Sequence, residues 1–156
     1  MKHERTWGLY RDGYGSFLAQ KRTGRSSEGI AVDDAQIHPI LFPFQRDITR
    51  WALRKGRAAV LIDTGLGKTF IQLEWARLLG VRTLIIAPLS VARQTIREAS
   101  KLDIEIKYVR AADEVSGDCR LWITNYEMME AFDLGSFGAI VLDESSILKA
   151  FDGKTR

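Results

Sequence analysis

The chain has 156 residues, of which 46% are hydrophobic and 28% are charged, and its net charge at pH 7 is +3. This composition is typical of a folded globular domain, excludes a largely disordered chain, and includes no apolar run near the ~18 residues that cross a bilayer. The only cysteine, Cys119, excludes an internal disulfide bond and favours a cytoplasmic location, and the mild basic excess in residues 1–57 is interpreted as solvated surface.

Residues 1–39 differ from the rest of the chain and are interpreted as an N-terminal extension. They contain a possible short helix at residues 15–21 and a loop-like stretch at residues 23–29. Four aromatic residues also gather there, namely Trp7, Tyr10, Tyr14 and Phe17.

A helix is predicted to begin at Pro43 and to stop at Gly56, because proline suits the first helical position and glycine the residue after the last one. The apolar residues at helical spacing, expected to share one face, are Phe44, Ile48, Trp51 and Ala52. A buried strand is predicted at residues 58–63, followed by a glycine-rich turn and a helix over residues 69–79. The residues of this second helix expected to point inward are Phe70, Leu73, Ala76 and Leu79.

The alternation of strands and helices continues to the end of the chain. Strands are predicted at residues 83–87, 104–109, 121–124 and 139–143, and helices at residues 89–101 and 126–132. Strands that alternate with helices at this spacing, without polar residues at every second position, indicate a parallel sheet that is covered by helices on both faces. The predicted fold class is therefore α/β.

The segment Asp63-Thr64-Gly65-Leu66-Gly67-Lys68-Thr69 is the strongest local signal. It follows a predicted strand and opens a predicted helix, which is the setting that a phosphate-binding loop requires. Glycines let backbone N–H groups approach a polyphosphate, and the helix N-terminus adds partial positive charge. Lys68 can reach the β- and γ-phosphates, and the Thr69 hydroxyl can bind Mg²⁺. We therefore expect ATP and Mg²⁺ to bind here.

The predicted strand at residues 139–143 ends in two carboxylates, Asp143 and Glu144. Near a phosphate-binding loop, Asp143 can hold Mg²⁺ and Glu144 can accept a proton from the attacking water. Alone this pattern is weak, because an apolar strand often reaches solvent through an acidic residue. Together with the glycine-rich loop, the acidic pair specifically indicates a site for Mg²⁺ and a nucleotide.

Two flanking segments narrow the class of nucleotide-binding protein. Gln45 lies in the first turn of its helix, and its amide offers the donor and acceptor needed to read adenine. The strand at residues 84–87 runs into Pro88 and a helix whose first turns could hold nucleic-acid phosphates. Taken singly, Gln45 is better explained as an ordinary polar residue near a helix start, and the Pro88 segment is also explained by a plain turn from strand to helix.

Together, in this order, the segments resemble superfamily 2 helicases, with wording closest to Swi/Snf-like DEAD/DEAH-box proteins of phage and prophage origin. The matching segments are FPFQ at 42–45, DTGLGKT at 63–69, APLSVARQ at 87–94, ITNYEM at 123–128 and VLDESS at 141–146. The resemblance implies that residues 40–156 form part of a P-loop, RecA-like lobe. In the complete protein, this lobe would belong to a motor that hydrolyses ATP and moves on nucleic acid, with DNA favoured over RNA but not distinguished from it by the sequence. The resemblance further implies a bacterial or phage-infected host cytoplasm and no membrane.

The resemblance also assigns roles to individual residues. Lys68, Asp143 and Glu144 would be catalytic, and Thr69 and Asp143 would bind Mg²⁺. The residues implied in ATP binding are Gln45, Thr64, Gly65, Leu66, Gly67, Lys68 and Thr69. The residues implied in nucleic-acid binding are Pro88, Leu89, Ser90, Gln94, Thr124 and Asn125.

The sequence departs from the family in two respects. The acidic motif reads Asp-Glu-Ser-Ser, so Ser146 leaves open how hydrolysis couples to unwinding or translocation. The chain stops before the next motif and the second lobe, so residues 1–156 are expected to be neither a working motor nor a complete lobe. A central strand would then be missing between residues 58–63 and 139–143. A P-loop ATPase of another class, or a nucleotide-binding fragment without catalysis, remains the alternative.

Overall fold

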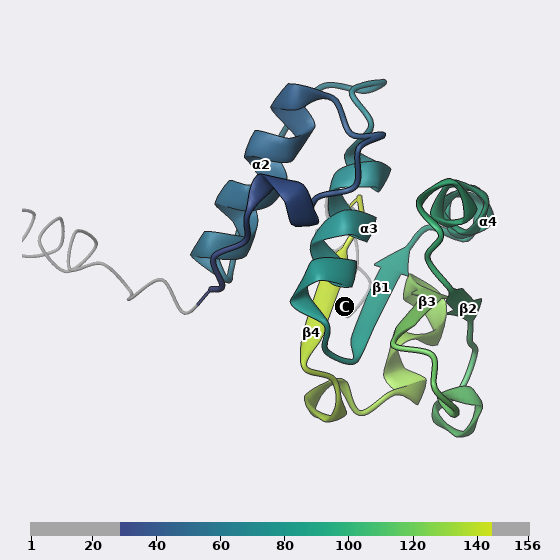
Figure 1. Cartoon of the computed structure of the whole chain (residues 1–156). Coiled ribbons are helices and arrows are strands. Elements are labelled where there is room, and N and C mark those ends of the chain that lie inside the picture. The colour runs from purple at the N-terminus through teal and green to yellow at the C-terminus, as the bar shows by residue number, and fades with distance from the viewer. Residues whose placement is uncertain (1–28, 145–156) are drawn as a thin grey trace, which may run out of the picture.

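The computed structural model describes residues 29–144, which form an α/β unit around one four-stranded, all-parallel sheet (Figure 1). The strands are β1 (Thr83–Ala87), β2 (Ile106–Tyr108), β3 (Leu121–Asn125) and β4 (Ala139–Leu142), in the spatial order β2-β3-β1-β4. The α/β class and the parallel sheet are as the sequence predicts. The expected helix at residues 15–21 lies outside the described residues.

Within residues 29–144, three α-helices accompany the sheet: α2 (Pro43–Lys55), α3 (Lys68–Leu79) and α4 (Leu89–Ala99). In Figure 1, α3 lies across β1 and β4, and α2 lies on the outer side of α3, away from the sheet. Short 3₁₀ turns complete the unit: η1 (Asp34–Gln36), η2 (Ser100–Leu102), η3 (Ala112–Glu114), η4 (Tyr126–Ala131) and η5 (Leu134–Ser136). Within the described residues, no helix is long and apolar enough to cross a membrane.

The two faces of the sheet are covered differently. Ile85, Ala87 and Ile123 pack with α3 and α4 on one face. Leu84, Ile86 and Trp122 belong to a second cluster on the other face, which is closed by the 3₁₀ turn η4 and the loops around it (Phe132 and Phe137). Within residues 29–144, α-helices therefore cover only one face, and a 3₁₀ helix with its flanking loops covers the other, so the predicted covering of both faces by helices is confirmed only in part. The segment that follows β3 forms a 3₁₀ helix over Tyr126–Ala131, where the sequence predicts a helix over residues 126–132.

Helix α2 has the predicted ends, with Pro43 at its first position and Gly56 as its C-cap at φ 70°. Its buried face is rotated from the expected one. The buried residues are Gln45, Thr49, Ala52 and Leu53. Phe44 and Trp51 are 41% and 44% exposed, so of the predicted face only Ala52 is buried. The periodicity is helical as predicted, but α2 packs against α3 through a partly polar stripe, which apolar spacing alone cannot reveal.

The predicted strand at residues 58–63 is not a strand. These residues form no regular element, and Leu61 is 92% exposed. Strand β4 instead pairs with β1, through Thr83↔Ala139 to Ile86↔Leu142, and among the described residues β1 is its only strand neighbour. An apolar run becomes a strand only where a partner strand satisfies its backbone groups, and here residues 58–63 have none.

The register brings the carboxyl ends of β1, β3 and β4 to one edge of the sheet, because Ala87 pairs with Asn125 and Ile86 with Leu142. Helix α3 ends at the start of the turn into β1, so its N-terminus lies towards this same edge. In open parallel α/β sheets, ligands bind at this edge.

Candidate nucleotide-binding site

The glycine loop, residues 64–67, forms a turn that leads directly into α3. Gly65 and Gly67 have φ values of 83° and 72°, a conformation that residues with a side chain rarely adopt. Gly67 is the N-cap of α3, so the free N–H groups of the first helical turn face the loop. This geometry favours an anion such as a phosphate group.

Lys68 is the first residue of α3, and its side chain folds back towards the segment that precedes the loop. The ammonium group donates hydrogen bonds to the carbonyl oxygens of Ile62 at 2.8 Å and Asp63 at 3.4 Å. The positive charge is thereby held against the two residues that precede the glycine loop, and the N-terminus of α3 adds partial positive charge of its own.

Gln45 connects α2 to the glycine loop. Its amide group accepts a hydrogen bond from the Phe42 N–H at 2.9 Å and donates one to the Leu66 carbonyl oxygen at 3.0 Å. The side chain is 4% exposed, and a Cβ atom added at Gly67 would lie 2.4 Å from its Nε2. Gly67 is favoured by its positive φ value, and a side chain at this position would displace the Gln45 amide. Each end of the amide predicted to read adenine already has a partner within the chain.

Asp143 lies immediately after β4 and is held against α3. Its Oδ2 accepts a hydrogen bond from Gln72 Nε2 at 3.2 Å. Gln72 follows Lys68 by one helical turn on the same face of α3, roughly 6 Å along the axis. The structure therefore brings the Asp143 carboxylate close to the first turns of the helix that carries Lys68 and Thr69. Gln72 was not predicted, although its i+4 spacing from Lys68 was available in the sequence.

Glu144, the last described residue, has φ 56° and is one of two non-glycine residues at positive φ in residues 29–144. Its side chain is exposed. Just before it, the Asp143 carbonyl oxygen accepts a hydrogen bond from the Tyr126 hydroxyl at 2.6 Å. Burial raises the pKa of Tyr126 above its ordinary value, and the negative charges of Asp143 and Glu144 raise it further.

The donor set at this edge suits Mg²⁺. The Thr69 hydroxyl and the Asp143 carboxylate supply hard oxygen ligands, and Mg²⁺ is commonly held by one or two such groups together with phosphate oxygens and water. Residues 29–144 contain no cluster of three or more His, Cys, Asp or Glu side chains able to hold a metal ion by themselves. Thr69 and Asp143 are the residues at this edge that could hold Mg²⁺ together with the phosphate oxygens of a nucleotide.

The residues predicted to bind nucleic acid divide into two groups. Leu89, Ser90 and Gln94 are exposed on the first turns of α4, with Pro88 as its N-cap. The Gln94 amide donates to Glu98 at 2.8 Å.

Thr124 and Asn125, at the end of β3, are 0% and 4% exposed. The Asn125 side chain accepts a hydrogen bond from the Tyr108 hydroxyl at 2.9 Å and donates one to Glu127. In this structure, therefore, only the α4 group presents side chains to a partner.

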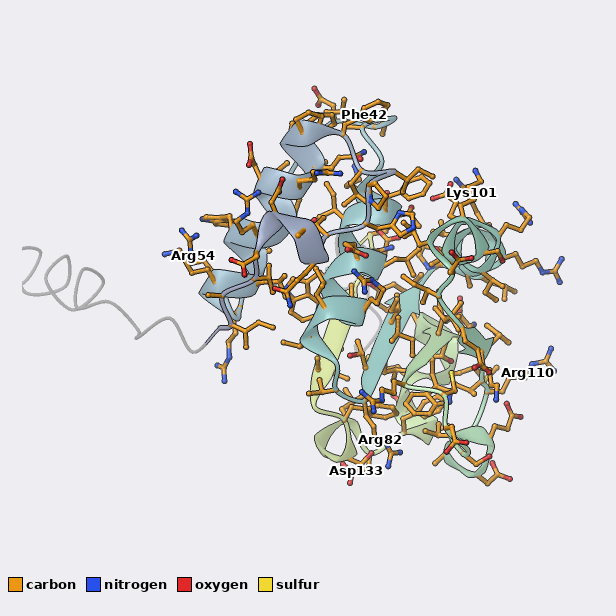
Figure 2. The ribbon with its side chains drawn as sticks, in the orientation of Figure 1. Phe42, Arg54, Arg82, Lys101, Arg110 and Asp133 are labelled. Atoms are coloured by element: carbon orange, nitrogen blue, oxygen red, sulfur yellow. The ribbon has the colours of Figure 1, made fainter. Side chains whose placement is uncertain are left out.

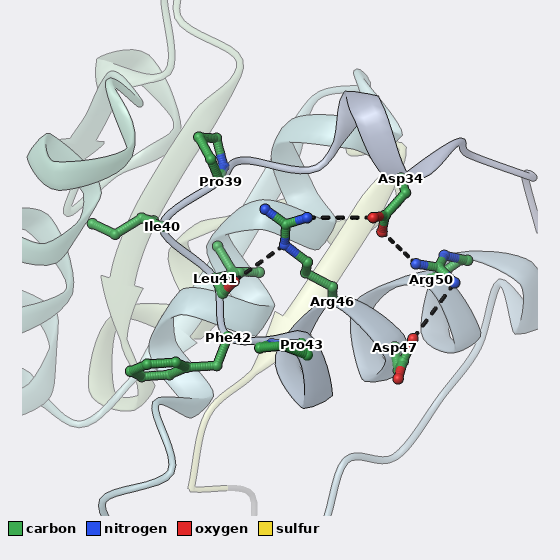
Figure 3. Close-up of a pocket in the computed structure, with 9 residues that line it drawn as sticks. All are labelled: Asp34, Pro39, Ile40, Leu41, Phe42, Pro43, Arg46, Asp47 and Arg50. Atoms are coloured by element: carbon green, nitrogen blue, oxygen red, sulfur yellow. Dashed lines mark hydrogen bonds and ion pairs between the residues drawn. The ribbon is translucent and has the colours of Figure 1, made fainter.

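A separate hollow of about 500 Å³ lies beside the start of α2 (Figure 3). Its lining includes Phe42, which is 65% exposed and lies at the end of α2 opposite Arg54 (Figure 2). Asp34 pairs there with Arg46 at 3.3 Å and with Arg50 at 2.5 Å. These ion pairs fasten η1 to α2, and the hollow includes no residue of the glycine loop.

A group of hydrogen bonds centred on Glu74 and Arg77 holds the segment before α2 against α3. Glu74 is fully buried and accepts hydrogen bonds from the His38 N–H at 2.7 Å and from Arg77 at 2.7 and 2.8 Å. Arg77 also donates to the Gln36 carbonyl oxygen at 2.6 Å. The segment that leads to Gln45 is therefore tied to the helix that follows the glycine loop.

Comparison of the sequence with protein-family models gives no match, and comparison with curated proteins gives no significant match. The likeness to superfamily 2 helicases therefore depends on the motifs and on the geometry described above.

Proposed function

We propose that this chain is the ATP-binding part of a nucleic-acid helicase or translocase with a P-loop, RecA-like lobe. The observation that carries the proposal is the contact of Asp143, at the carboxyl edge of a parallel sheet, with α3, the helix that begins at Lys68 directly after the glycine loop. A phosphate-binding loop and an acidic strand end lie together in this way in enzymes that bind Mg-ATP.

In this proposal each residue has a chemical task. The N–H groups of the glycine loop and the Lys68 ammonium bind the phosphates, and Thr69 and Asp143 hold Mg²⁺. Bound Mg²⁺ neutralises charge on the phosphates. Glu144 accepts a proton from the water that attacks the γ-phosphate. The exposed residues of α4 bind the phosphates and sugars of the nucleic acid without reading its sequence.

Calorimetric titration of the full chain with Mg-ATP tests the nucleotide site. Lys68→Ala should weaken binding by at least about tenfold, because it removes charge-assisted hydrogen bonds to phosphate. Lys107→Ala is a matched control, since Lys107 is an exposed lysine on β2 that pairs only with Glu105 in the described residues. Equal affinity in the Lys68 variant and the control would rule out the site.

One observation favours a P-loop ATPase of another class. Gln45 is buried and uses its amide on Phe42 and Leu66, so an adenine base would have to share a group that is already engaged. Competition of GTP against ATP, in the wild type and in Gln45→Ala, separates the two functions. A helicase-like site should lose adenine preference in the variant, by about 1–3 kcal/mol on the scale of bidentate base recognition. An unchanged ratio favours the other class.

A further inference from the structure

Asp143 is held by three elements at once. Its N–H donates to the Ile86 carbonyl oxygen of β1 at 2.9 Å, and its carboxylate accepts from Gln72 of α3. Its carbonyl oxygen accepts from Tyr126, the first residue of η4. The regular pairing of β4 ends at Leu142, so the Tyr126 bond fixes the peptide group just beyond the last paired residue.

The Tyr126 ring is itself fixed by packing. It is 3% exposed and belongs to the cluster that contains Leu84, Ile86 and Trp122 on the face of the sheet opposite α3. Its hydroxyl therefore approaches Asp143 from one side of the sheet, whereas Gln72 approaches from the other. The bonds of the Asp143 N–H to Ile86 and of its carbonyl oxygen to Tyr126 leave the Asp143 backbone little freedom to rotate, and Gln72 holds the carboxylate from the other side.

We propose that Tyr126 is a positioning residue that aims the Asp143 carboxylate at the Mg²⁺ ion of a bound nucleotide. This inference rests on the proposed function of the same site. A buried tyrosine hydroxyl needs some acceptor, but packing alone does not require that acceptor to be the residue whose side chain faces the glycine-loop helix. Because the ring fills the core and only the hydroxyl reaches Asp143, replacing tyrosine with phenylalanine separates the two roles.

The test measures the affinity of the full chain for ATP by calorimetry, once with excess Mg²⁺ and once with EDTA. The ratio of the two affinities reports how well Asp143 engages the metal. Tyr126→Phe should leave the metal-free affinity unchanged and lower this ratio about 3- to 10-fold, the effect of losing one hydrogen bond. Tyr108→Phe is the matched control, because it removes another tyrosine hydroxyl bond from the same sheet without contacting Asp143.

Each outcome decides the proposal. An unchanged ratio in Tyr126→Phe overturns it, as does an equal loss of both affinities, which would mean a general structural role. A variant that fails to fold in thermal unfolding would likewise assign the hydroxyl to stability and overturn the proposal. If the wild type binds no ATP with or without metal, the proposed function itself fails. If the wild type binds Mg-ATP and Tyr126→Phe binds it identically, only the role of Tyr126 fails.

Discussion

The two segments on either side of α3 are both apolar in sequence, but only the one that follows α3 forms a strand. Residues 58–63 precede the glycine loop and form no strand, with Leu61 92% exposed. Strand β1 follows α3 and is completely buried along its length. The difference lies in their neighbours: β1 pairs with both β3 and β4, and residues 58–63 pair with no strand in the described chain. Apolar composition permits a strand, and hydrogen-bonding partners decide whether it forms.

The contrast has a consequence for the site. The segment without a strand carries the two carbonyl oxygens that hold Lys68, whereas the central strand anchors Asp143. One half of the candidate site therefore rests on a rigid sheet, and the other half rests on a loop that α2 supports through Gln45.

Hydrogen exchange should give the largest difference between the two segments. The amides of residues 58–63 make no backbone hydrogen bond within the described chain and should exchange almost freely. Amides in β1 should exchange only on global unfolding, at rates lower by a factor on the order of 10³ or more. Comparable protection in the two segments, measured by mass spectrometry or NMR, would mean that residues 58–63 find a strand partner in solution.

Truncation of one side chain in each segment should give the next largest difference. Ile85→Ala removes a fully buried side chain in the centre of the sheet and should lower the free energy of unfolding by about 2–5 kcal/mol. Leu61→Ala should change it by less than about 0.5 kcal/mol, because the side chain is already in water. Urea denaturation of both variants measures this, and a large loss in Leu61→Ala would contradict the exposed position.

The glycines at the two ends of α3 sharpen the comparison further. Gly67 and Gly80 have similar φ values of 72° and 69°, but only at Gly67 would a Cβ atom lie close to another residue, 2.4 Å from Gln45 Nε2. Both alanine variants should lose about 1 kcal/mol of stability from backbone strain. Gly67→Ala should in addition weaken ATP binding severalfold by displacing Gln45 from the glycine loop. Equal ATP affinity in the two variants would contradict this.

The smallest expected effect concerns Tyr126, which packs against β1 residues Leu84 and Ile86. Its pKa is raised by burial and by the charges of Asp143 and Glu144, so the folded state keeps the proton longer than the unfolded state. The stability contribution is complete below the unfolded pKa near 10 and is lost as the pH rises through the higher folded pKa. In metal-free buffer, Tyr126→Phe should make stability fall less steeply above pH 10, as measured by denaturation at several pH values. An identical loss of stability above pH 10 in the wild type and in Tyr126→Phe would mean that the ionisation of Tyr126 does not cause that loss.

The sequence by itself determined the α/β class, the parallel sheet and the ends of α2, because helix caps and apolar runs act over a few neighbouring residues. It also identified the glycine loop and the Asp143–Glu144 pair, since glycine at positive φ and an acid at a strand end are local requirements. The resemblance to helicases predicted a function that remains to be tested.

Only the tertiary structure decided which apolar segment is a strand, which face of α2 is buried and which face of the sheet carries the α-helices. The tertiary structure also places Gln72 and Tyr126 in hydrogen bonds to Asp143, and it pairs the Gln45 amide with the Leu66 carbonyl oxygen. It buries Thr124 completely. These features depend on contacts between residues far apart in the chain, such as Gln72 with Asp143 and Gln45 with Leu66. Periodicity and composition report how a segment could fold, but a hydrogen bond needs a particular partner, and the packing of α2, α3 and the sheet selects that partner.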